Sequence, residues 1–597
     1  MTPFTTRPEI RGSFGVTTST HWIASTVGFG ILEKGGNAFD AAAAAGFVLQ
    51  VVEPHLNGPA GDLPIIFHDA EKQATKVVCA QGVSPAAAKL EHFEELGLKL
   101  IPGSGLLSTV VPGAFDGWML MLRDHGTMAL RDVLQPAIDY ARDGHPVLPR
   151  VSNTIKGLAE YFADEWPSSA AVWTPGGAAP EPNANFKNPD LATTYERLVS
   201  EAEAVGEDRS AQIEAARKIW SEGFVADAIF DYLEDACVHD VSEQKNSALL
   251  AREDMAKWQA SYEDTLTYEY HGWTVHKTHA WSQGPVFLQA LAILKHFDLA
   301  AMDPMGASFT HTVIEAMKLA YADREAYYGD PEQSIIPMEE LLSDAYNAER
   351  AKLVNGKASL EQRPGVIAGL EHLAERYIER AARDFGVQNA APQEPTMAHL
   401  TEKRGDTVHL DVIDRWGNMV SATPSGGWLQ SNPVVPGLGF PLNSRAQMFW
   451  LERGLPTSLA PGRRPRTTLT PSFAEHSDGR QLVFGTPGGD QQDQWQLIWF
   501  LRFVHHGIDL QEGMDAPLFH TMHFQSSFFP RQALPGEMMI EPNVGAAVID
   551  ALRARGHIVT VAEPWSVGRM TAALRNPDGS LQAAATPRLM QAYAVGR

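Results

Sequence analysis

Apolar residues along this chain follow helical spacing in some stretches and strand alternation in others. Helical spacing occurs in residues 20–33, 37–53, 112–144, 212–236 and 308–328. The first stretch is followed by Gly35 and Gly36, which are typical of a helix end, and the second stops before Pro54. We predict helices in these stretches and expect residues 153–240 to form helices that cover a sheet.

Strand-like runs lie between and after these stretches. They are residues 63–70, 74–82, 407–414, 419–423, 471–475 and 481–484. From Thr407 onward, Val408, Leu410 and Val412 alternate with polar side chains, as the two-residue period of a strand requires. The turn at residues 414–418 then predicts a hairpin.

The segment in front of this hairpin has a different character. Residues 388–406 contain proline and polar residues without any period, which predicts an exposed linker. A strand that begins with threonine is commonplace, but a flexible linker directly before it is the arrangement that a self-processing enzyme needs. The nucleophile of such an enzyme must be reachable in the precursor and become a free N-terminus afterwards.

Composition narrows the class of protein. The 597 residues are 44% hydrophobic and 20% charged, which is typical of a globular protein of roughly four domains by length alone. The net charge of -24 argues against a nucleic-acid binder or a binder of anionic membranes, because either needs a concentrated basic face. No run reaches the roughly 20 apolar residues of a membrane span, and the N-terminus lacks the apolar segment of a secretory signal.

The two cysteines, Cys79 and Cys237, cannot form a disulfide framework and have no thiols or histidines at zinc-ligand spacing. We therefore expect a reducing compartment, the cytoplasm. The histidine pairs at 505–506 and at 520 and 523 have no carboxylate at a metalloenzyme spacing, so we expect neither a metal nor a cofactor.

A threonine at a new N-terminus combines two catalytic groups. Its hydroxyl is a nucleophile, and its α-amine, with an ordinary pKa of about 7.7–8.0, is suited to act as the base near neutral pH. The hydroxyl of Thr407 can also attack the carbonyl of Asp406 to give an ester that water opens. Processing and catalysis would then share one site.

Several motifs, in order along the chain, carry a resemblance to a known family. They are "GILEKGGNAFDAAAAAGFVLQVVEPHLNGPAGD", "TVVPGAFDGWMLMLRDHGTMALRDVLQPAIDYARDG", "IEAMKLAYADREAYYGDP", "GDTVHLDVIDRWGNMVSATPS", "LAPGRRPRTTLTPSF" and "GTPGGD". Together they resemble the γ-glutamyltranspeptidase family of N-terminal nucleophile hydrolases over nearly the whole chain. The resemblance implies an α+β fold, a four-layer αββα sandwich.

The resemblance also implies roles for individual residues. Thr407 corresponds to the processing threonine, Ser425 to a hydroxyl that orients it, and Gly488 and Gly489 to the backbone N–H groups that bind the oxyanion. Thr467 and Thr468 stand where family members carry two serines for the substrate carboxylate, although a bare pair of threonines is also typical of strand surface. Without the other motifs, the glycine pair would indicate only a tight turn.

The chain differs from the family at the residues that bind the amino and carboxylate groups of a γ-glutamyl substrate. The position of the family's arginine falls on Gln81, that of its asparagine on Gly427, and its acidic and glutamine positions fall near Met448 and Arg445. We infer a divergent member that keeps the chemistry and has changed its substrate. Arg445 offers a relocated guanidinium for a substrate carboxylate, or else belongs to a structural ion pair.

We therefore predict cleavage between Asp406 and Thr407 into a large chain, residues 1–406, and a small chain, residues 407–597, intertwined in one domain. The predicted activity is hydrolysis of a small amide, with oxamate amidohydrolase among the relatives that fit the missing clamp, and we expect a homo-oligomer. Two alternatives remain: a true γ-glutamyltransferase or glutathione hydrolase, and an unprocessed relative that only binds.

Overall fold

Two antiparallel seven-stranded sheets form the centre of the computed structural model, which describes residues 4–383 and 407–597. The order in the first sheet is β1 (Ile10–Gly12), β20 (Leu581–Ala585), β19 (Thr571–Arg575), β15 (Gln481–Gly485), β14 (Ser472–His476), β11 (Trp273–Lys277) and β10 (Leu266–Tyr270). The order in the second is β21 (Tyr593–Gly596), β2 (Gly15–Ser19), β12 (Leu410–Asp414), β13 (Met419–Ala422), β3 (Leu63–Asp69), β4 (Ala74–Ala80) and β9 (Ser261–Asp264).

The two sheets pack face to face through a shared apolar core. Val16, Ile66, Val77, Ile413 and Met419 of the second sheet form one buried cluster with Phe473, Val483, Ala573, Leu581 and Ala583 of the first. Alternation along β12 sends Leu410 and Val412 the other way, into the core under the helices. Both faces of β12 are therefore buried.

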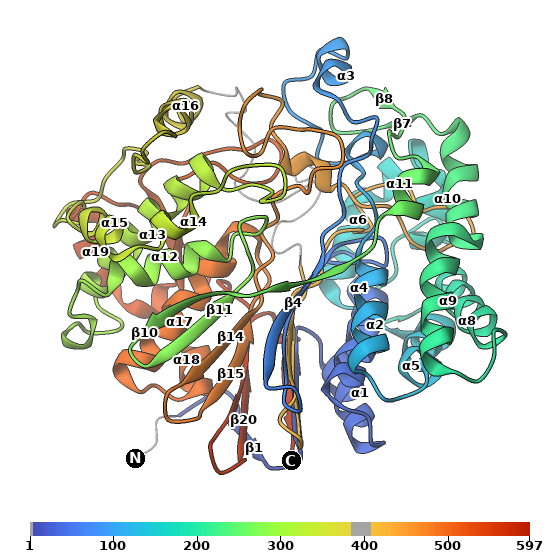
Figure 1. The fold of residues 1–597 in the computed structure, drawn as a ribbon, viewed down its shortest axis with the longest axis horizontal. Helices are drawn as coiled ribbons and strands as arrows, with labels where there is room; N and C mark the ends of the chain where they lie inside the picture. Colours follow the sequence, from blue (N-terminus) through green and yellow to red (C-terminus); the bar gives the residue numbers. More distant parts are fainter. Residues whose placement is uncertain (1–3, 384–406) are drawn as a thin grey trace.

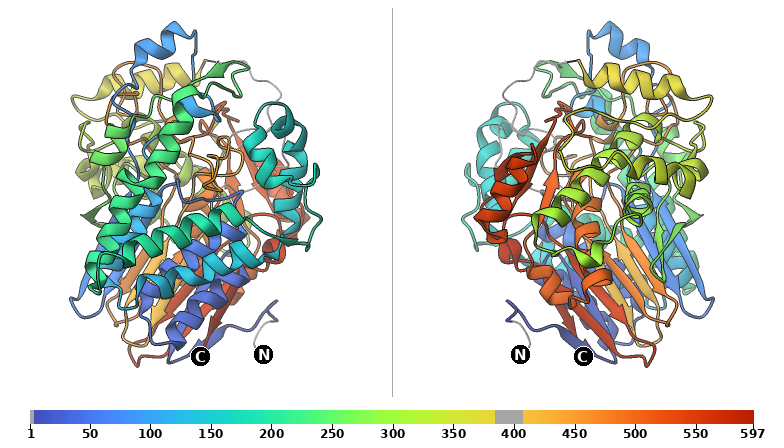
Figure 2. Two further views of the ribbon diagram at one scale, coloured as in Figure 1. Left: turned by 90° about the vertical axis from the view of Figure 1, so that its right-hand side faces the viewer. Right: turned by 90° about the vertical axis from the view of Figure 1, so that its left-hand side faces the viewer.

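Helices cover the outer face of each sheet. The second sheet is covered by α1 (Trp22–Glu33), α2 (Ala38–Val52), α4 (Ala114–His125) and α5 (Leu130–Asp143), with α8 (Pro189–Glu203), α9 (Arg209–Glu222) and α10 (Phe224–Asp235) beyond them. The first sheet is covered by α12 (Pro285–Leu294), α13 (Ala307–Tyr327) and α17 (Gln492–His506). Figure 1 shows these layers side by side, and Figure 2 shows each helical layer from its own side. The predicted αββα sandwich is confirmed.

The remaining elements surround this core. They are α3 (Leu90–Glu95), α6 (Pro149–Asp164), α7 (Pro167–Trp173), α11 (Arg252–Lys257), α14 (Met338–Leu341), α15 (Asp344–Ala351), α16 (Glu371–Ala381), α18 (Leu510–Asp515), α19 (Ala546–Ala554), a two-stranded sheet of β5 (His145–Pro146) and β6 (Asn185–Phe186), another of β7 (Val238–His239) and β8 (Lys245–Asn246), and a small sheet of β16 (Phe519–Thr521), β17 (Glu537–Ile540) and β18 (Ile558–Val561). In the described residues, no helix combines the length and the apolar character needed to cross a membrane.

Local sequence explains why α2 lies at the centre. The Asn37 side chain accepts hydrogen bonds from the N–H groups of Phe39 and Asp40, and the Asp40 carboxylate accepts one from the N–H of Asn37. This capping box satisfies N–H groups that no preceding turn can reach. The alanine run that follows is wholly buried, which allows close packing against α1 and the sheet.

The predicted strand at residues 407–414 begins later than expected. Regular pairing starts at Leu410, whereas Thr407 forms only a single bridge with Ser425. The N–H of Val408 donates to the carbonyl of Pro424 at 3.2 Å, but proline has no N–H to return a bond, so the ladder is interrupted there. The predicted linker and Asp406 lie outside the described residues.

Candidate active site

Thr407 is buried where the two sheets meet the loop before β3. Its Oγ1 donates to Oγ of Ser425 at 3.2 Å, and its side chain is fully enclosed. Ser425 is held in turn by two backbone hydrogen bonds with Asp62, of 2.8 and 3.0 Å. The fold thus brings together two predicted residues that are 18 positions apart, and it adds Asp62, which belongs to the distant N-terminal part.

A buried polar network fixes the strand that carries Thr407. The two ring nitrogens of His409 contact Thr423 Oγ1 at 2.9 Å and Asp411 Oδ1 at 3.0 Å. The other oxygen of Asp411 accepts hydrogen bonds from Thr571 Oγ1 at 2.7 Å and Thr18 Oγ1 at 3.1 Å. Because these bonds reach three neighbouring strands, they restrain the start of β12 from both sheets.

Gly488 and Gly489 begin the 3₁₀ turn Gly489–Gln491 that leads into α17, in backbone conformations that favour glycine. Their φ angles are 125° and 55°, and a Cβ on Gly488 would lie 2.2 Å from the ring of Trp495. The first turn of such a helix presents N–H groups and the positive end of the helix dipole, a suitable environment for an oxyanion. These features fit the predicted role, while the close contact with Trp495 also gives Gly488 a packing role.

Arg569 connects this glycine turn with Thr407. Its backbone N–H donates to Oγ1 of Thr486, two residues before Gly488, and its guanidinium donates to the carbonyl oxygen of Thr407 at 3.5 Å. Sequence reasoning missed Arg569 because nothing in the surrounding residues 565–575 marks it. The folded structure reveals the role of Arg569 through its hydrogen bond to Thr407, which lies 162 positions earlier in the chain.

Arg445 forms a buried ion pair, one of the two roles that the sequence allowed for it. Two of its guanidinium nitrogens remain available for a ligand. Nε donates to Oδ1 of Asp62 at 2.8 Å, and the guanidinium stacks on Trp428 at 4.9 Å from the ring centre. Nη1 and Nη2 are buried without a hydrogen-bond partner in the described part of the chain. Burial raises the pKa of Asp62, and the charge of Arg445 opposes that rise.

The other predicted binding residues gather near this pair. Thr467 donates to Oδ2 of Asp62 at 3.3 Å, so it is not ordinary strand surface. Leu63 pairs with Ala80 in the antiparallel ladder of β3 and β4. If the same register is extended by one residue, Gln81 lies opposite Asp62. Oγ1 of Thr468 and both amide atoms of Gln81 are buried and find no partner among residues 4–383 and 407–597. Buried polar atoms without a protein partner are satisfied by water, by an ion or by a ligand, so these atoms are available for contact with a substrate.

Gly427 contributes to the site through its backbone, which passes close to another loop. Its φ angle is 64°, and a Cβ on Gly58 would lie 2.3 Å from the carbonyl oxygen of Gly427. A Cβ on Gly61 would likewise lie 2.0 Å from the carbonyl oxygen of Ser425. The loop at residues 58–62 and the segment 425–427 therefore meet backbone to backbone, which only glycine permits.

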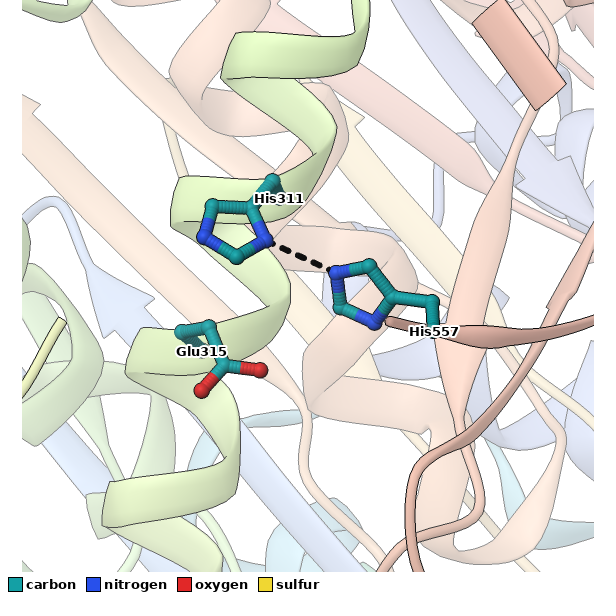
Figure 3. Close-up of side chains that lie close together, drawn as sticks. All are labelled: His311, Glu315 and His557. Atoms are coloured by element: carbon teal, nitrogen blue, oxygen red, sulfur yellow. Dashed lines mark hydrogen bonds between the residues drawn. The ribbon is translucent and has the colours of Figure 1, made fainter. Parts of the chain in front are cut away.

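One group of side chains elsewhere has the composition of a metal site. His311 and Glu315 lie one turn apart on α13, and His557 approaches them from the segment before β18 (Figure 3). However, His311 Nδ1 and His557 Nε2 contact each other at 2.8 Å, and the carboxylate of Glu315 already binds Lys318 at 2.7 Å and Arg363 at 3.0 Å. Two cations on the carboxylate oppose a third, so the group fits a structural network better than a metal site.

Three of the four histidines noted in the sequence have hydrogen-bond partners in the described residues, whereas Nε2 of His506 has none there. His505 Nε2 contacts the hydroxyl of Tyr270 at 2.7 Å, and His520 Nδ1 accepts from Trp495 Nε1 at 3.3 Å. His523 accepts from the N–H of Gly536 at 2.9 Å. These bonds account for the three side chains as parts of the fold.

Comparisons with known proteins point to one family. A family model described as gamma-glutamyltranspeptidase matches residues 24–596. Among curated proteins, the chain is 27% identical to the glutathione hydrolase-like YwrD proenzyme of Bacillus subtilis (97% of this chain, 98% of that one). It is 29% identical to the acylase ACY 1 proenzyme of Pseudomonas sp. strain SE83 (96% and 92%) and 28% identical to the oxamate amidohydrolase proenzyme of Klebsiella pneumoniae (96% and 97%).

Solved structures agree with this assignment. A threonine-to-alanine variant of LmbA2991 superposes with a TM-score of 0.92 at 51% identity, with full coverage of both chains. The cephalosporin acylase of Bacillus halodurans superposes with a TM-score of 0.80 at 25% identity, covering 100% of this chain and 98% of that one. Both neighbours share the whole fold.

Proposed function

Because the chain belongs to the γ-glutamyltranspeptidase family, we propose that it is a self-processing amide hydrolase whose nucleophile is Thr407. The observation that carries this proposal is the buried contact of 3.2 Å between Thr407 Oγ1 and Ser425 Oγ at the start of β12. The names of similar relatives as proenzymes also support it.

Processing makes the catalytic base. Thr407 Oγ attacks the carbonyl carbon of Asp406, the C–N bond breaks, and the nitrogen takes a proton to become the free α-amine of Thr407. Water then hydrolyses the resulting ester, which releases the carboxyl group of Asp406 and restores the hydroxyl. Before this step the nitrogen belongs to an amide and cannot act as a base.

Hydrolysis then proceeds through an acyl-enzyme. The α-amine takes the proton of Oγ as Oγ attacks the substrate amide, and N–H groups of Gly488 and Gly489 bind the oxyanion. The departing amine takes that proton, leaving an ester on Thr407. The α-amine next deprotonates a water, which attacks the ester and frees the acid. Ser425 orients the hydroxyl throughout.

For the substrate, we propose a compact amide with a carboxylate on its acyl side. Arg445 supports this because its two nitrogens that lack a partner in the described residues form the fork that binds a carboxylate by parallel hydrogen bonds. Gln81 and Thr468 supply neutral polar atoms nearby, in contrast to the charged clamp that a γ-glutamyl head requires. The relative named as an oxamate amidohydrolase acts, by its name, on an amide with a carboxylate next to the scissile carbonyl.

The test compares wild-type protein with the Thr407→Ala variant. Wild-type protein should give two bands on a denaturing gel, with the smaller fragment beginning at Thr407, and should hydrolyse a carboxylate-bearing amide. The variant should stay at full length and be inactive. Processing that survives in the variant would show that the bond or the nucleophile is wrong.

Two alternatives separate in the same experiment. Release of p-nitroaniline from a γ-glutamyl anilide would favour the γ-glutamyltransferase or glutathione hydrolase that the name of the YwrD relative suggests. A single full-length band after prolonged incubation of wild-type protein would favour a relative that only binds.

A further inference from the structure

Four arginine side chains from distant parts of the sequence gather around two carboxylates. They are Arg324, Arg380, Arg466 and Arg531, each at most 2% exposed, and we call them the arginine cluster. Arg324 binds Glu325 at 2.8 Å and Asp490 at 2.6 Å, and Arg466 binds Glu325 at 2.8 Å. Arg380 and Arg531 stack on one ring, that of Trp450, at 4.5 and 4.2 Å from its centre.

The cluster buries more positive than negative charge. In the described ranges, Arg380 and Arg531 have no carboxylate within ion-pair distance: Arg380 binds the Gln525 side chain and the carbonyl of Glu325, and Arg531 binds two backbone carbonyls. The next acid, Glu452, is already paired with Arg376 at 2.8 Å.

These guanidinium groups remain charged at neutral pH. Burial lowers the pKa of Arg531 only to about 9, so this side chain keeps its proton under ordinary conditions. Burial of charges without counter-charge is strongly unfavourable, and natural proteins balance it with a partner of opposite sign.

The cluster also has hydrogen-bond donors to spare. Nη1 of Arg380, of Arg466 and of Arg531 are each buried, and none has a partner in the described residues. Water can accept hydrogen bonds from such groups. Only an anion, however, satisfies the donors and also balances the charge.

We propose that the arginine cluster binds one small monovalent anion, of the halide or carboxylate class, through the three Nη1 groups. The site lies beside both halves of the candidate active site. Arg324 holds Asp490, the residue after Gly489, and Ser527 donates to the same carboxylate at 2.7 Å. Arg531 holds the carbonyl of Gln447, in the same short turn as Arg445. Anion binding therefore stabilises the turns that present the catalytic groups.

The experiment uses purified full-chain wild-type protein, processed or not, in a buffer whose anion is a bulky sulfonate. Sodium bromide and sodium formate are titrated separately at constant ionic strength while the melting temperature is recorded. We expect a saturable rise of several degrees with at least one of them, since a ligand that binds only the folded state raises Tm. Crystals soaked in bromide should give an anomalous peak against the Nη1 atoms, or, if formate alone binds, formate density there.

Two arginine variants provide the matched comparison. Arg380→Met removes an arginine that has no carboxylate partner among the described residues, and Arg217→Met removes one that is also buried, at 4% exposed, and is paired through two nitrogens with Asp116. Arg380→Met should lose the anion response or need at least tenfold more anion, whereas Arg217→Met should keep the response although its Tm is lower. In anion-free buffer, Arg380→Met should lose less stability than Arg217→Met, because it deletes an uncompensated charge.

The proposal is overturned by equal anion responses in the two variants, or by soaked wild-type crystals that hold only water at the cluster. If Arg380→Met does not fold, the soaked wild-type crystals decide alone. None of these measurements depends on amide hydrolysis, so they stand whether or not the proposed activity is found.

Discussion

At the residue scale, Arg445 combines a structural and a binding task in one side chain. Nε is committed to Asp62, which lies 383 positions away and joins the backbone of Ser425 beside the nucleophile. This ion pair fixes the plane of the guanidinium and leaves Nη1 and Nη2 for a ligand. A guanidinium held in this way loses little further conformational entropy when it binds a carboxylate.

Replacement of Arg445 by lysine tests this division. Lysine keeps the charge and can still reach Asp62, but it cannot form the two parallel hydrogen bonds. For an amide with a carboxylate on its acyl side, KM should rise about tenfold or more, in line with roughly 1.5–3 kcal/mol for a charged hydrogen bond. The same molecule with a neutral amide in place of that carboxylate is the control and should be affected much less. An equal loss on both substrates in fully processed protein would contradict the binding role.

At the element scale, the site depends on two loops that meet through their backbones. Gly61 lies so close to residues 425 and 426 that an added Cβ would sit 2.0 Å from one carbonyl oxygen and 2.6 Å from the other. These carbonyls cannot move away without displacing Ser425 from Thr407. The close approach therefore sets the position of the hydroxyl next to the nucleophile.

The variant Gly61→Ala should accordingly slow both processing and hydrolysis. Overpacking of this kind costs typically 1–3 kcal/mol, and the displaced Ser425 should lower the processing rate about tenfold, measured as the half-time for appearance of two bands on a gel. Gly30→Ala is the control, because a Cβ at Gly30 in α1 meets nothing within 4 Å. This control should process normally and be as stable as wild type or slightly more so. Processing of Gly61→Ala at the wild-type rate would refute the argument.

Much of the secondary structure follows from local pattern. Apolar spacing predicts α1, α2, α13 and the hairpin of β12 and β13 to within a few residues, because burial of one or both faces leaves a clear period. The start of β12 was misplaced, since pairing there depends on Pro424, which follows the partner strand β13.

The site was less accessible to sequence reasoning than the helices and strands. The motifs led to Thr407, Ser425, Gly488 and Gly489, and the fold brings the first two into contact. The first motif ends at Asp62 without indicating its role, and no motif contains Arg569; the parts that both play in the site depend on contacts across 383 and 162 positions. Charge pairing at such distances leaves no period and no fixed spacing in the sequence.

At the scale of the whole molecule, residues before 384 and after 406 are interleaved in each sheet. In the second sheet, β12 lies between β2 and β13, and β21 pairs with β2. In the first sheet, β1 pairs with β20. The two parts therefore cannot separate without breaking the hydrogen-bonded ladders that join their strands.

We therefore expect the fragments of the processed protein to stay together. Size-exclusion chromatography in native buffer should give one species that contains both bands, and the fragments should separate only in denaturant. Unfolding should be a single transition for both fragments, because they share the core between the sheets. Separation of the fragments in native buffer would be inconsistent with this topology.

A buried carboxylate at the junction of the two parts gives the whole molecule a pH-dependent stability. Glu53 follows α2, is fully buried, and accepts hydrogen bonds from Thr20 at 2.6 Å and from Gln591 at 2.5 Å. Burial raises the pKa of Glu53 from 4.5 to about 7, against the opposing charges of Arg569 and Arg150. Between pH 4.5 and 7, the folded state keeps a proton that the unfolded state has released. The contribution of protonated Glu53 to the free energy of unfolding is therefore fully present below pH 4.5 and is lost as the pH rises towards 7.

The variant Glu53→Gln imitates the protonated form at every pH and should remove this dependence. Near pH 4 its free energy of unfolding, measured with urea, should differ from that of wild type only by the change in hydrogen bonding. As the pH rises to 7, the variant should gain stability relative to wild type by up to about 3 kcal/mol, the equivalent of the pKa difference between 4.5 and about 7. A difference that stays constant from pH 4 to 8 would show that Glu53 ionises as an ordinary glutamate. In that case, Glu53 would carry a buried negative charge at neutral pH, between its hydrogen-bond partners Thr20 and Gln591 from the two parts of the chain.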